Sequence, residues 1–401
     1  MKALFKILLI IGLTCANANT KQNLNINQVD ILQSLDIPQN FTHTSYYKDM
    51  KKSITKRQID DFVRVLRAGY KYIPILKTSV KSSGLPEPFF YLAMVESGFS
   101  NKVVSNAKAA GIWQFMAVTA QAHGLKIDKY VDERRDPIKA TNAAAKYLKG
   151  LKSQFGKWYL AILAYNCGDG CLRKAIRNAG TDDLTTLLDP NAKYLPDETR
   201  RFIIKILRAS IIAKDSEFIL SRDANILSTQ GQKLTRVSVP GGTTLKQVGD
   251  SVGLSVKRLK EENTHLNYAF TPPNSKNYHI YLPESKLSIF NENFKPIQSN
   301  NKFYTYTVKK GDTLLNIAKT SGVSHKAIKE YNELQTSIIS INQKLIIPRS
   351  DRNKIQSYVV QNGDTLEILS KRFNVAIKDI KEANALASND VLAIGDNIVI
   401  P

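Results

Sequence analysis

One carboxylic acid in this chain stands where acid–base chemistry would be favoured. Glu96 closes the apolar run Phe89–Val95, and Ser97 and Gly98 follow it. If this run is a helix that ends near Gly98, its apolar neighbours and the negative end of the helix dipole both penalise the ionised form of Glu96. A carboxylic acid that stays protonated near neutral pH can protonate a glycosidic oxygen. A helix-terminal glutamate that simply faces solvent is the alternative that this feature leaves open.

The elements that must position Glu96 show a helical period from residue 55 to residue 215. Pro86 and Pro88 precede the apolar run, and proline is favoured in the first turn of a helix. Apolar residues recur at spacings of three and four along this stretch. They include Ile59, Phe62, Val63, Leu66, Phe202, Ile203, Ile206 and Leu207. The pattern predicts one all-helical domain over 55–215, and the polar, Asn- and Gln-rich residues 19–54 indicate a loosely packed lead-in.

After residue 215 the sequence changes to short β-branched segments that repeat. Gly311–Leu314 reads Gly-Asp-Thr-Leu and recurs as Gly363–Leu366, and Asn332 recurs as Asn384. A looser copy contains Gly242–Leu245, in which Thr243 replaces the aspartate. The repeats predict three strand–helix–helix–strand modules, at 234–283, 303–348 and 356–401, with linkers at 284–302 and 349–355. Gly-Asp-Thr alone favours a tight turn in which Asp or Thr caps the next helix.

These repeats resemble LysM modules, the small βααβ units that bind glycans containing N-acetylglucosamine. The resemblance implies glycan binding by the recurring Gly-Asp-Thr and Asn residues of the second and third copies. These are Gly311, Asp312, Thr313, Asn332, Gly363, Asp364, Thr365 and Asn384. Because Thr243 departs from the pattern, the module at 234–283 is expected to be degenerate. The helix-capping turn remains the alternative reading of the same residues.

Four motifs follow one another in the helical domain: Glu96-Ser97, Gly111–Met116, Ala164–Asn166 and Glu198–Phe202. In this order they resemble the lysozyme-like catalytic domain of the lytic murein transglycosylases, and most closely the membrane-bound D group, which carries C-terminal LysM modules. The resemblance therefore implies an α+β multidomain protein, with an all-α lysozyme-like catalytic domain followed by βααβ LysM modules.

The resemblance also implies the site and its reaction. Glu96 would be both acid and base, so that the MurNAc–GlcNAc bond breaks without water and leaves a 1,6-anhydroMurNAc end. The residues implied to bind the substrate are Ser97, Gly111, Gln114, Tyr165 and Asn166. Phe202 stands where the family usually has a tyrosine. Either Tyr194 or another nearby tyrosine supplies that hydroxyl, or packing holds Glu96 and raises its pKa further.

Hydrolytic mechanisms use two carboxyl groups, and the sequence offers poor candidates for a second one. The carboxylates in Asp132–Pro137 flank two adjacent arginines, a pattern that favours surface ion pairs. Asp169 lies between two glycines and is typical of a turn. We therefore predict a peptidoglycan lytic transglycosylase that needs no cofactor. The alternatives are a hydrolytic muramidase on the same fold and a non-catalytic peptidoglycan-binding protein.

Charge and cysteines bear on location and partners. The net charge of +22 is spread along the chain, which does not indicate a nucleic-acid partner but suits work near the polyanionic cell wall.

Residues 1–18 have the basic start, apolar core and Ala-x-Ala end of a signal peptide, which predicts the periplasm. Lipidation at Cys15, with association to the outer membrane, is the alternative to cleavage after Ala18. Cys167 and Cys171 could form a disulfide in that compartment. A metal site is less favoured, because the nearby sequence has no histidine or further cysteine to complete its ligands.

Overall fold

The computed structural model describes residues 28–215, 233–273, 275–296, 303–332, 334–348, 356–373, 375–386 and 392–400. The predicted signal peptide with Cys15 and the linker predicted at 349–355 lie outside these residues. The described chain forms two compact units. The first ends at residue 234 and lacks residues 128–131, which belong to the second together with residues 235 onward.

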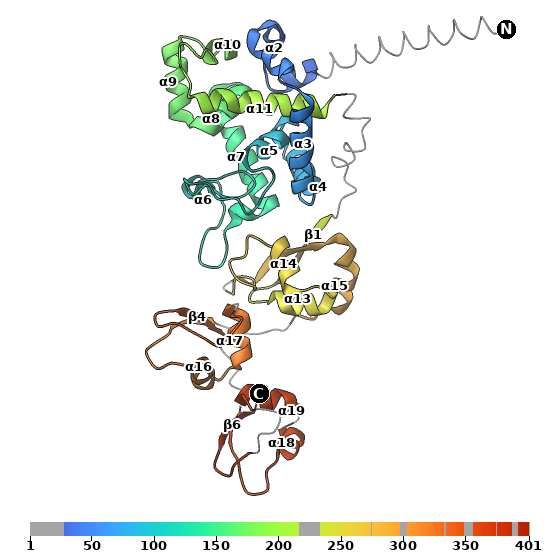
Figure 1. Ribbon diagram of the computed structural model, residues 1–401, viewed down its shortest axis with the longest axis vertical. Helices are drawn as coiled ribbons and strands as arrows, with labels where there is room; N and C mark the ends of the chain where they lie inside the picture. Colours follow the sequence, from blue (N-terminus) through green and yellow to red (C-terminus); the bar gives the residue numbers. More distant parts are fainter. Residues whose placement is uncertain are drawn as a thin grey trace, which may run out of the picture. The chain divides into compact units, whose positions relative to one another are not determined.

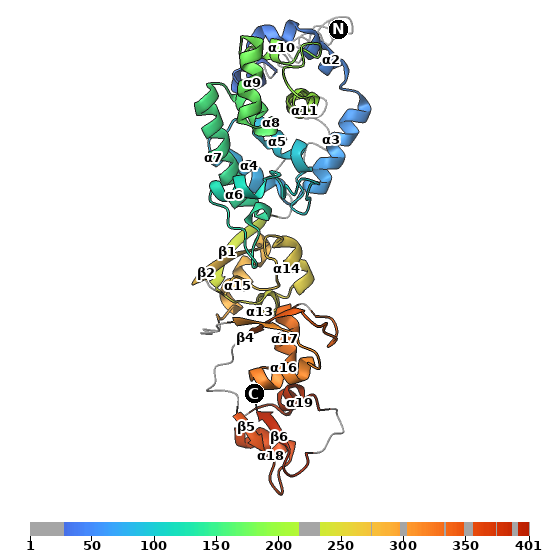
Figure 2. The same cartoon turned by 90° about the vertical axis from the view of Figure 1, so that its left-hand side faces the viewer.

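The first unit is helical, as the apolar periodicity predicts (Figure 1). Its elements are η1 (Gln39–His43), α2 (Ser45–Lys52), α3 (Lys56–Gly69), α4 (Ile73–Ser82), α5 (Pro88–Ser97), α6 (Ala117–Ala122), η2 (Glu133–Arg135), α7 (Pro137–Phe155), α8 (Trp158–Cys167), α9 (Asp169–Ala179), α10 (Leu184–Leu187) and α11 (Asp197–Ala213). Helix α11 packs on α5 and α8, and Figure 2 shows α11 nearly end-on among the other helices of the unit. The helix that carries Glu96 is therefore held at the centre of the domain.

The segment before α3 is not the loosely packed lead-in that its polar composition suggested. Residues 28–34 are helical, and Leu32, Leu35 and Phe41 are buried in the core of the helical unit. The carbonyl of Leu35 accepts a hydrogen bond from the Tyr159 amide at 3.0 Å. A few apolar residues at helical spacing are enough to dock this segment, even though Asn and Gln dominate its composition.

The second unit contains three modules, each with a two-stranded sheet, and the sheets of the second and third are antiparallel, which confirms the predicted βααβ architecture. The first module has β1 (Leu234–Pro240), α13 (Leu245–Val252), α14 (Val256–Glu262), β2 (Asn277–Pro283), η4 (Glu284–Lys286) and α15 (Leu287–Asn293). The second has β3 (Phe303–Thr307), α16 (Leu314–Ser321), α17 (His325–Asn332) and β4 (Lys344–Pro348), with Thr305 opposite Ile346. The third has β5 (Gln356–Val359), α18 (Leu366–Phe373), α19 (Ile377–Asn384) and β6 (Asn397–Ile400).

The first module is larger than its sequence repeat predicts. The stretch expected to be a linker at 284–302 contains η4 and α15, and α15 packs on α13 with Phe290 buried. Residues 128–131, expected in the helical domain, also belong to this unit because Tyr130 joins the same core and its carbonyl accepts the Asn267 amide at 2.8 Å. Across the described residues, every helix is too short or too polar to cross a membrane.

Candidate active site

Glu96 lies in the last turn of α5, where the sequence predicts it. Pro88 is at the first helical position, and Gly98 ends the helix in the left-handed conformation, with φ of 61° and its amide donating to the Met94 carbonyl at 2.8 Å. The residues Pro88–Ala93 are all buried, and the Glu96 side chain is half-buried. Proline at the start and glycine at the end thus fix where the carboxyl leaves the helix.

The surroundings of Glu96 favour its protonated form. Burial, followed by the nearby carboxylate of Glu198, raises the pKa of Glu96 to about 8. Within the described chain, no hydrogen bond to the Glu96 carboxyl is found that would stabilise its charge. The predicted desolvation is confirmed, and Glu198 adds a repulsion that the sequence analysis did not foresee. Glu96 is therefore a carboxylic acid at neutral pH, able to give a proton and then to take one.

Two predicted site residues hold the loop Gly111–Met116 against the helices. The Ser97 hydroxyl donates to the Ile112 carbonyl at 2.8 Å, and the Tyr165 hydroxyl donates to the Trp113 carbonyl at 2.7 Å. The Trp113 ring is buried, and its Nε1 donates to Thr141 Oγ1 at 2.9 Å. The loop is thereby fixed to α5, α7 and α8 through its own backbone.

Gly111 and Gln114 shape this loop from within. Gly111 has φ of 79°, and a Cβ there would lie 1.9 Å from the carbonyl oxygen of Arg134, so only glycine fits. The predicted close approach to the Gly111 backbone is present, but the group that approaches is the protein's own Arg134 carbonyl and not a ligand. Gln114 adopts φ of 47°, and its Nε2 donates to the Gly111 carbonyl at 2.8 Å. The Gln114 side chain remains partly exposed beside the loop.

The charged run after residue 131 does not form the surface ion pairs predicted for it. Asp132 and Glu133 are buried, and so is Asp136, whose carboxylate caps α7 by accepting from the Ile138 and Lys139 amides. Arg134 pairs with Asp132 at 2.8 Å, and its guanidinium also donates to the carbonyls of Lys108 and Phe115. These charges are buried because they tie the run to the Gly111 loop, a tertiary contact that spacing alone does not reveal. Asp169, expected in a turn, begins α9 and pairs with Arg173 at 3.1 Å.

Asn166 and the two cysteines lie where α8 ends and α9 begins. Asn166 Oδ1 accepts a hydrogen bond from Thr199 Oγ1 at 2.7 Å, which ties α8 to the start of α11. Cys167 and Cys171 are both free thiols, and burial followed by the neighbouring Cys171 raises the pKa of Cys167. The disulfide between them stays a prediction.

Among the described residues, no tyrosine hydroxyl, that of Tyr194 included, donates a hydrogen bond to the Glu96 carboxyl in place of the one missing at Phe202. Phe202 is buried in α11. Burial and the nearby Glu96 raise the pKa of Tyr165. The Tyr165 hydroxyl already donates to the Trp113 carbonyl. Of the two alternatives, the structure therefore supports packing. Tyr147 was missed by sequence reasoning, although its ring lies 5.4 Å from that of Tyr165, and its position on α7 at helical spacing gave no separate signal.

In the second and third modules the recurring motif residues bond to the modules themselves. Asp312 Oδ2 accepts from the Lys309 amide at 2.7 Å and from the Tyr306 hydroxyl at 2.8 Å. Asp364 makes the same two contacts with Gln361 and Tyr358. Thr313 accepts from the Asn316 amide and Thr365 from the Ile368 amide, so the turn-and-cap reading is confirmed. Gly311 and Gly363 have φ of 89° and 88°, as such a turn requires.

The side chains of the recurring asparagines join a helix to a strand by hydrogen bonds to the backbone of both. Asn332 donates to the carbonyls of Ile328 and Ile346 at 2.8 Å and accepts from the Ile346 amide at 2.6 Å. Asn384 does the same with Ile380 and Val399. The buried Asn263 repeats the pattern in the first module, which lacks the aspartate. Glycan binding by these residues stays a prediction.

Comparisons with known proteins cover both units. The model of the transglycosylase SLT domain matches residues 73–187, and the LysM domain model matches residues 306–348 and 358–401. Residues 233–299 match the LysM-like domain of the lytic transglycosylase MltD. The chain is 30% identical over 351 residues to the membrane-bound lytic murein transglycosylase D of Escherichia coli (strain K12), across 82% of this chain and 76% of that protein. The chain belongs to this transglycosylase family.

Family membership confirms the resemblance read from the motifs. The SLT match ends at residue 187, so α11 with Glu198 and Phe202 lies beyond it, whereas the LysM-like match to residue 299 includes α15. A probable N-acetylmuramidase of Lactococcus lactis subsp. cremoris is 32% identical over 120 residues, which cover 24% of this chain and 27% of that protein. The crystal structure of the 70 kDa soluble lytic transglycosylase of Escherichia coli is 23% identical, with a TM-score of 0.30 over 38% of this chain and 25% of that chain.

Proposed function

We propose that this chain cleaves the β-1,4 bond between MurNAc and GlcNAc in peptidoglycan without water, with Glu96 as the only acid and base. Membership of a lytic murein transglycosylase family supports the reaction class, and the LysM modules support peptidoglycan as the ligand. The observation that carries the role of Glu96 is its pKa of about 8 at the end of a buried helix.

Each proton can be followed through the proposed reaction. Glu96 gives its proton to the glycosidic oxygen as the bond from that oxygen to C1 of MurNAc breaks, so GlcNAc leaves with a free hydroxyl. The N-acetyl group of the substrate stabilises the positive charge at C1. The Glu96 carboxylate then removes the proton of the MurNAc 6-hydroxyl, whose oxygen bonds to C1 and closes the 1,6-anhydro ring. Glu96 ends protonated, ready for another turnover.

The other predicted site residues would act through the loop that they hold. Because Ser97 and Tyr165 bond to consecutive carbonyls of Gly111–Met116, they fix the loop relative to Glu96. Gln114 and the exposed side chain of Met116 are then the parts of this loop available to the glycan. We propose that Asn166 orients the same region through its bond to Thr199.

Hydrolysis is the second candidate, because Glu198 lies close enough to Glu96 to raise its pKa. Glu198 is exposed on α11 and could act as the base that activates a water in a two-carboxylate mechanism. The two reactions differ in product mass, since the anhydro product lacks one water. They also differ in what Glu198 contributes: it is essential for hydrolysis, and in the anhydro reaction it only tunes the pKa of Glu96.

Digestion of purified sacculi followed by mass spectrometry tests the proposal. The unaltered chain should release 1,6-anhydromuropeptides, and Glu96→Gln should lose at least about a hundredfold in rate because general acid–base catalysis contributes that much or more. Glu198→Gln should retain most of the activity near neutral pH. Hydrated products that vanish in Glu198→Gln would establish the hydrolytic alternative, and activity retained in Glu96→Gln would refute the role of Glu96.

Family membership places the chain in the cell envelope. We propose export to the periplasm, supported by the basic and apolar pattern of residues 1–18. Cleavage after Ala18 would leave a mature protein without Cys15, whereas lipidation at Cys15 would anchor it to the outer membrane. The mass of the mature N-terminal peptide separates the two.

A further inference from the structure

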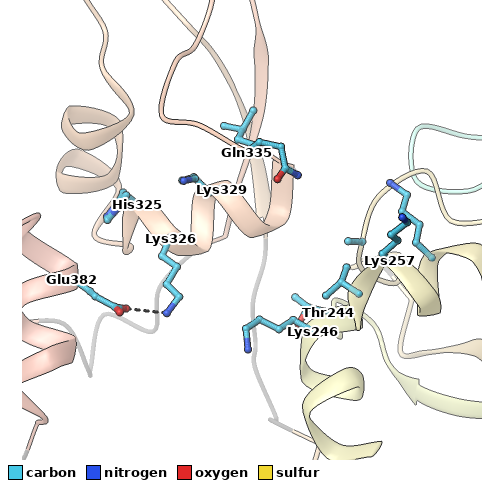
Figure 3. Close-up of a pocket in the computed structure, with 12 residues that line it drawn as sticks. Thr244, Lys246, Lys257, His325, Lys326, Lys329, Gln335 and Glu382 are labelled. Carbon is cyan, nitrogen blue, oxygen red and sulfur yellow. Dashed lines mark hydrogen bonds and ion pairs between the residues drawn. The ribbon is translucent and has the colours of Figure 1, made fainter. Parts of the chain in front are cut away.

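A cavity of about 920 Å³ opens in the second unit where its three modules meet (Figure 3). Its walls come from α13 and α14 of the first module, α17 of the second and α19 of the third. The rings of Phe270 and Tyr331 pack 5.1 Å apart between the first two modules, and Lys326 pairs with Glu382 at 2.9 Å between the last two. The cavity is therefore a product of module packing, absent from any single module.

The lining of the cavity is strongly basic. Among the described residues that line it, five lysines face one carboxylate, that of Glu382, which is paired with Lys326. The lysines are Lys246, Lys257, Lys260, Lys326 and Lys329. In Figure 3 the side chains of Lys246 and Lys326 extend from facing walls into the space between the modules. Like charges brought together around a cavity favour an anionic occupant.

Two of these lysines have no counter-charge among the residues that the structure describes. Lys257 and Lys329 make no ion pair within the described ranges of the chain, whereas Lys246 pairs with Asp250 at 2.6 Å. Lys257 projects from α14 and Lys329 from α17, so the charges available to a ligand come from two different modules. An extended anion that spans the junction would neutralise both.

The remaining lining narrows the ligand chemistry. Val256, Ala269 and Leu334 supply apolar surface among the lysines, and the volume exceeds what a single inorganic ion would fill. The ligand should carry several negative charges beside small apolar groups. A glycan of N-acetylglucosamine alone is neutral and would leave the lysines without a partner, and a MurNAc without its stem carries only the single carboxylate of its lactyl group. The peptide stems of peptidoglycan carry carboxylates next to alanine methyl groups and meet both requirements.

We infer that this cavity binds the acidic peptide stems of peptidoglycan strands. The inference rests on the proposed function for the identity of the polymer, but concerns a different site and a different part of that polymer. Glycan held by the modules would bring stems to the junction, where even weak contacts gain from effective concentration. Strands that still carry stems would therefore bind the second unit more tightly than strands stripped of them.

Binding of the full chain to solubilised strands tests the inference. Glu96→Gln is placed in every protein so that the strands are not degraded, and strands with stems are compared with neutral oligomers of N-acetylglucosamine. The cavity pair Lys257→Glu/Lys329→Glu should lose about tenfold in affinity for strands with stems, less at high salt, and nothing for the neutral oligomers. The matched pair Lys319→Glu/Lys371→Glu reverses two exposed lysines outside the cavity and should change neither.

The outcomes are separable. Unchanged binding to the neutral oligomers shows that the cavity variant is folded and still holds glycan. The inference is overturned if the cavity pair binds stem-bearing strands as well as the control pair does, or if it loses affinity equally for the strands and the oligomers. It is also overturned if the cavity pair lowers the affinity for polyphosphate and leaves the affinity for stem-bearing strands unchanged. A failure of the unaltered chain to release 1,6-anhydromuropeptides from sacculi would refute the proposed function without touching this result.

Discussion

Two carboxyl groups in this chain are treated in opposite ways. Glu96 stands at the C-terminal end of α5 with no hydrogen bond from the described residues, and burial and Glu198 raise its pKa. Asp312 stands just before α16, where the Lys309 amide and the Tyr306 hydroxyl lower its pKa. A helix C-terminus, burial and the lack of donors all raise the pKa of Glu96. A helix N-terminus and two donors lower the pKa of Asp312.

The difference separates motif residues that bond to their own module from the carboxyl group that we propose as the acid and base. In the modules, the side chains of Asp312, Thr313 and Asn332 are all engaged with the local backbone. In the helical unit, Ser97 and Tyr165 are likewise engaged, but they hold a loop beside a carboxyl that is left without a donor. A solitary protonated acid among satisfied polar groups is the feature that distinguishes the catalytic unit.

The largest effect on stability is expected in the modules. Asn332→Ala removes three hydrogen bonds and leaves the Ile346 amide and carbonyl without their partner, which should cost about 2–3 kcal/mol in the second module. Hydrogen exchange of the β4 amides measures this loss. Asn316→Ala, an exposed asparagine of α16, is the control and should change exchange little. Equal exchange in the two variants would break the contrast, because the asparagine would then not hold the module.

An effect of the opposite sign is expected at Glu96. Its pKa is raised from 4.5 to about 8 on folding, so the folded state retains a proton that the unfolded state loses between those values. The free energy of unfolding of the unaltered chain should therefore fall as pH rises from about 4.5 to about 8. Because glutamine carries no charge, the free energy of unfolding of Glu96→Gln should not fall over this range of pH. Denaturant titrations at several pH values measure the difference, and parallel curves would contradict it.

The smallest effect concerns the pH at which activity is lost. Anhydro product formation should fall as pH rises through about 8, because Glu96 then loses the proton that it must donate. Glu198→Gln removes a nearby negative charge and should move this midpoint down by about half a unit. Asp197→Asn, the exposed neighbour that pairs with Arg200 at 2.9 Å, should leave it in place. If the midpoint is the same in Glu198→Gln as in the unaltered chain, burial alone raises the pKa of Glu96.

Local signals predicted the fold and part of the site. Pro88 and Gly98 mark the ends of α5 in the sequence itself, and the repeat of Gly-Asp-Thr reveals the modules before any contact is known. The proximity of Glu198 to Glu96 could not be predicted, because it depends on how α11 packs on α5. The burial of Asp132 was missed for the same reason, since it follows from the approach of Arg134 to Gly111.

The central claim is that Glu96 is protonated at neutral pH. Infrared or carbon NMR spectra of the chain labelled at the glutamate carboxyl, taken as the difference from Glu96→Gln, follow this one group through a pH titration. The account predicts a protonated carboxyl at pH 7 that ionises near pH 8. A carboxylate already ionised at pH 6, with a midpoint near the ordinary value of about 4.5, would contradict it.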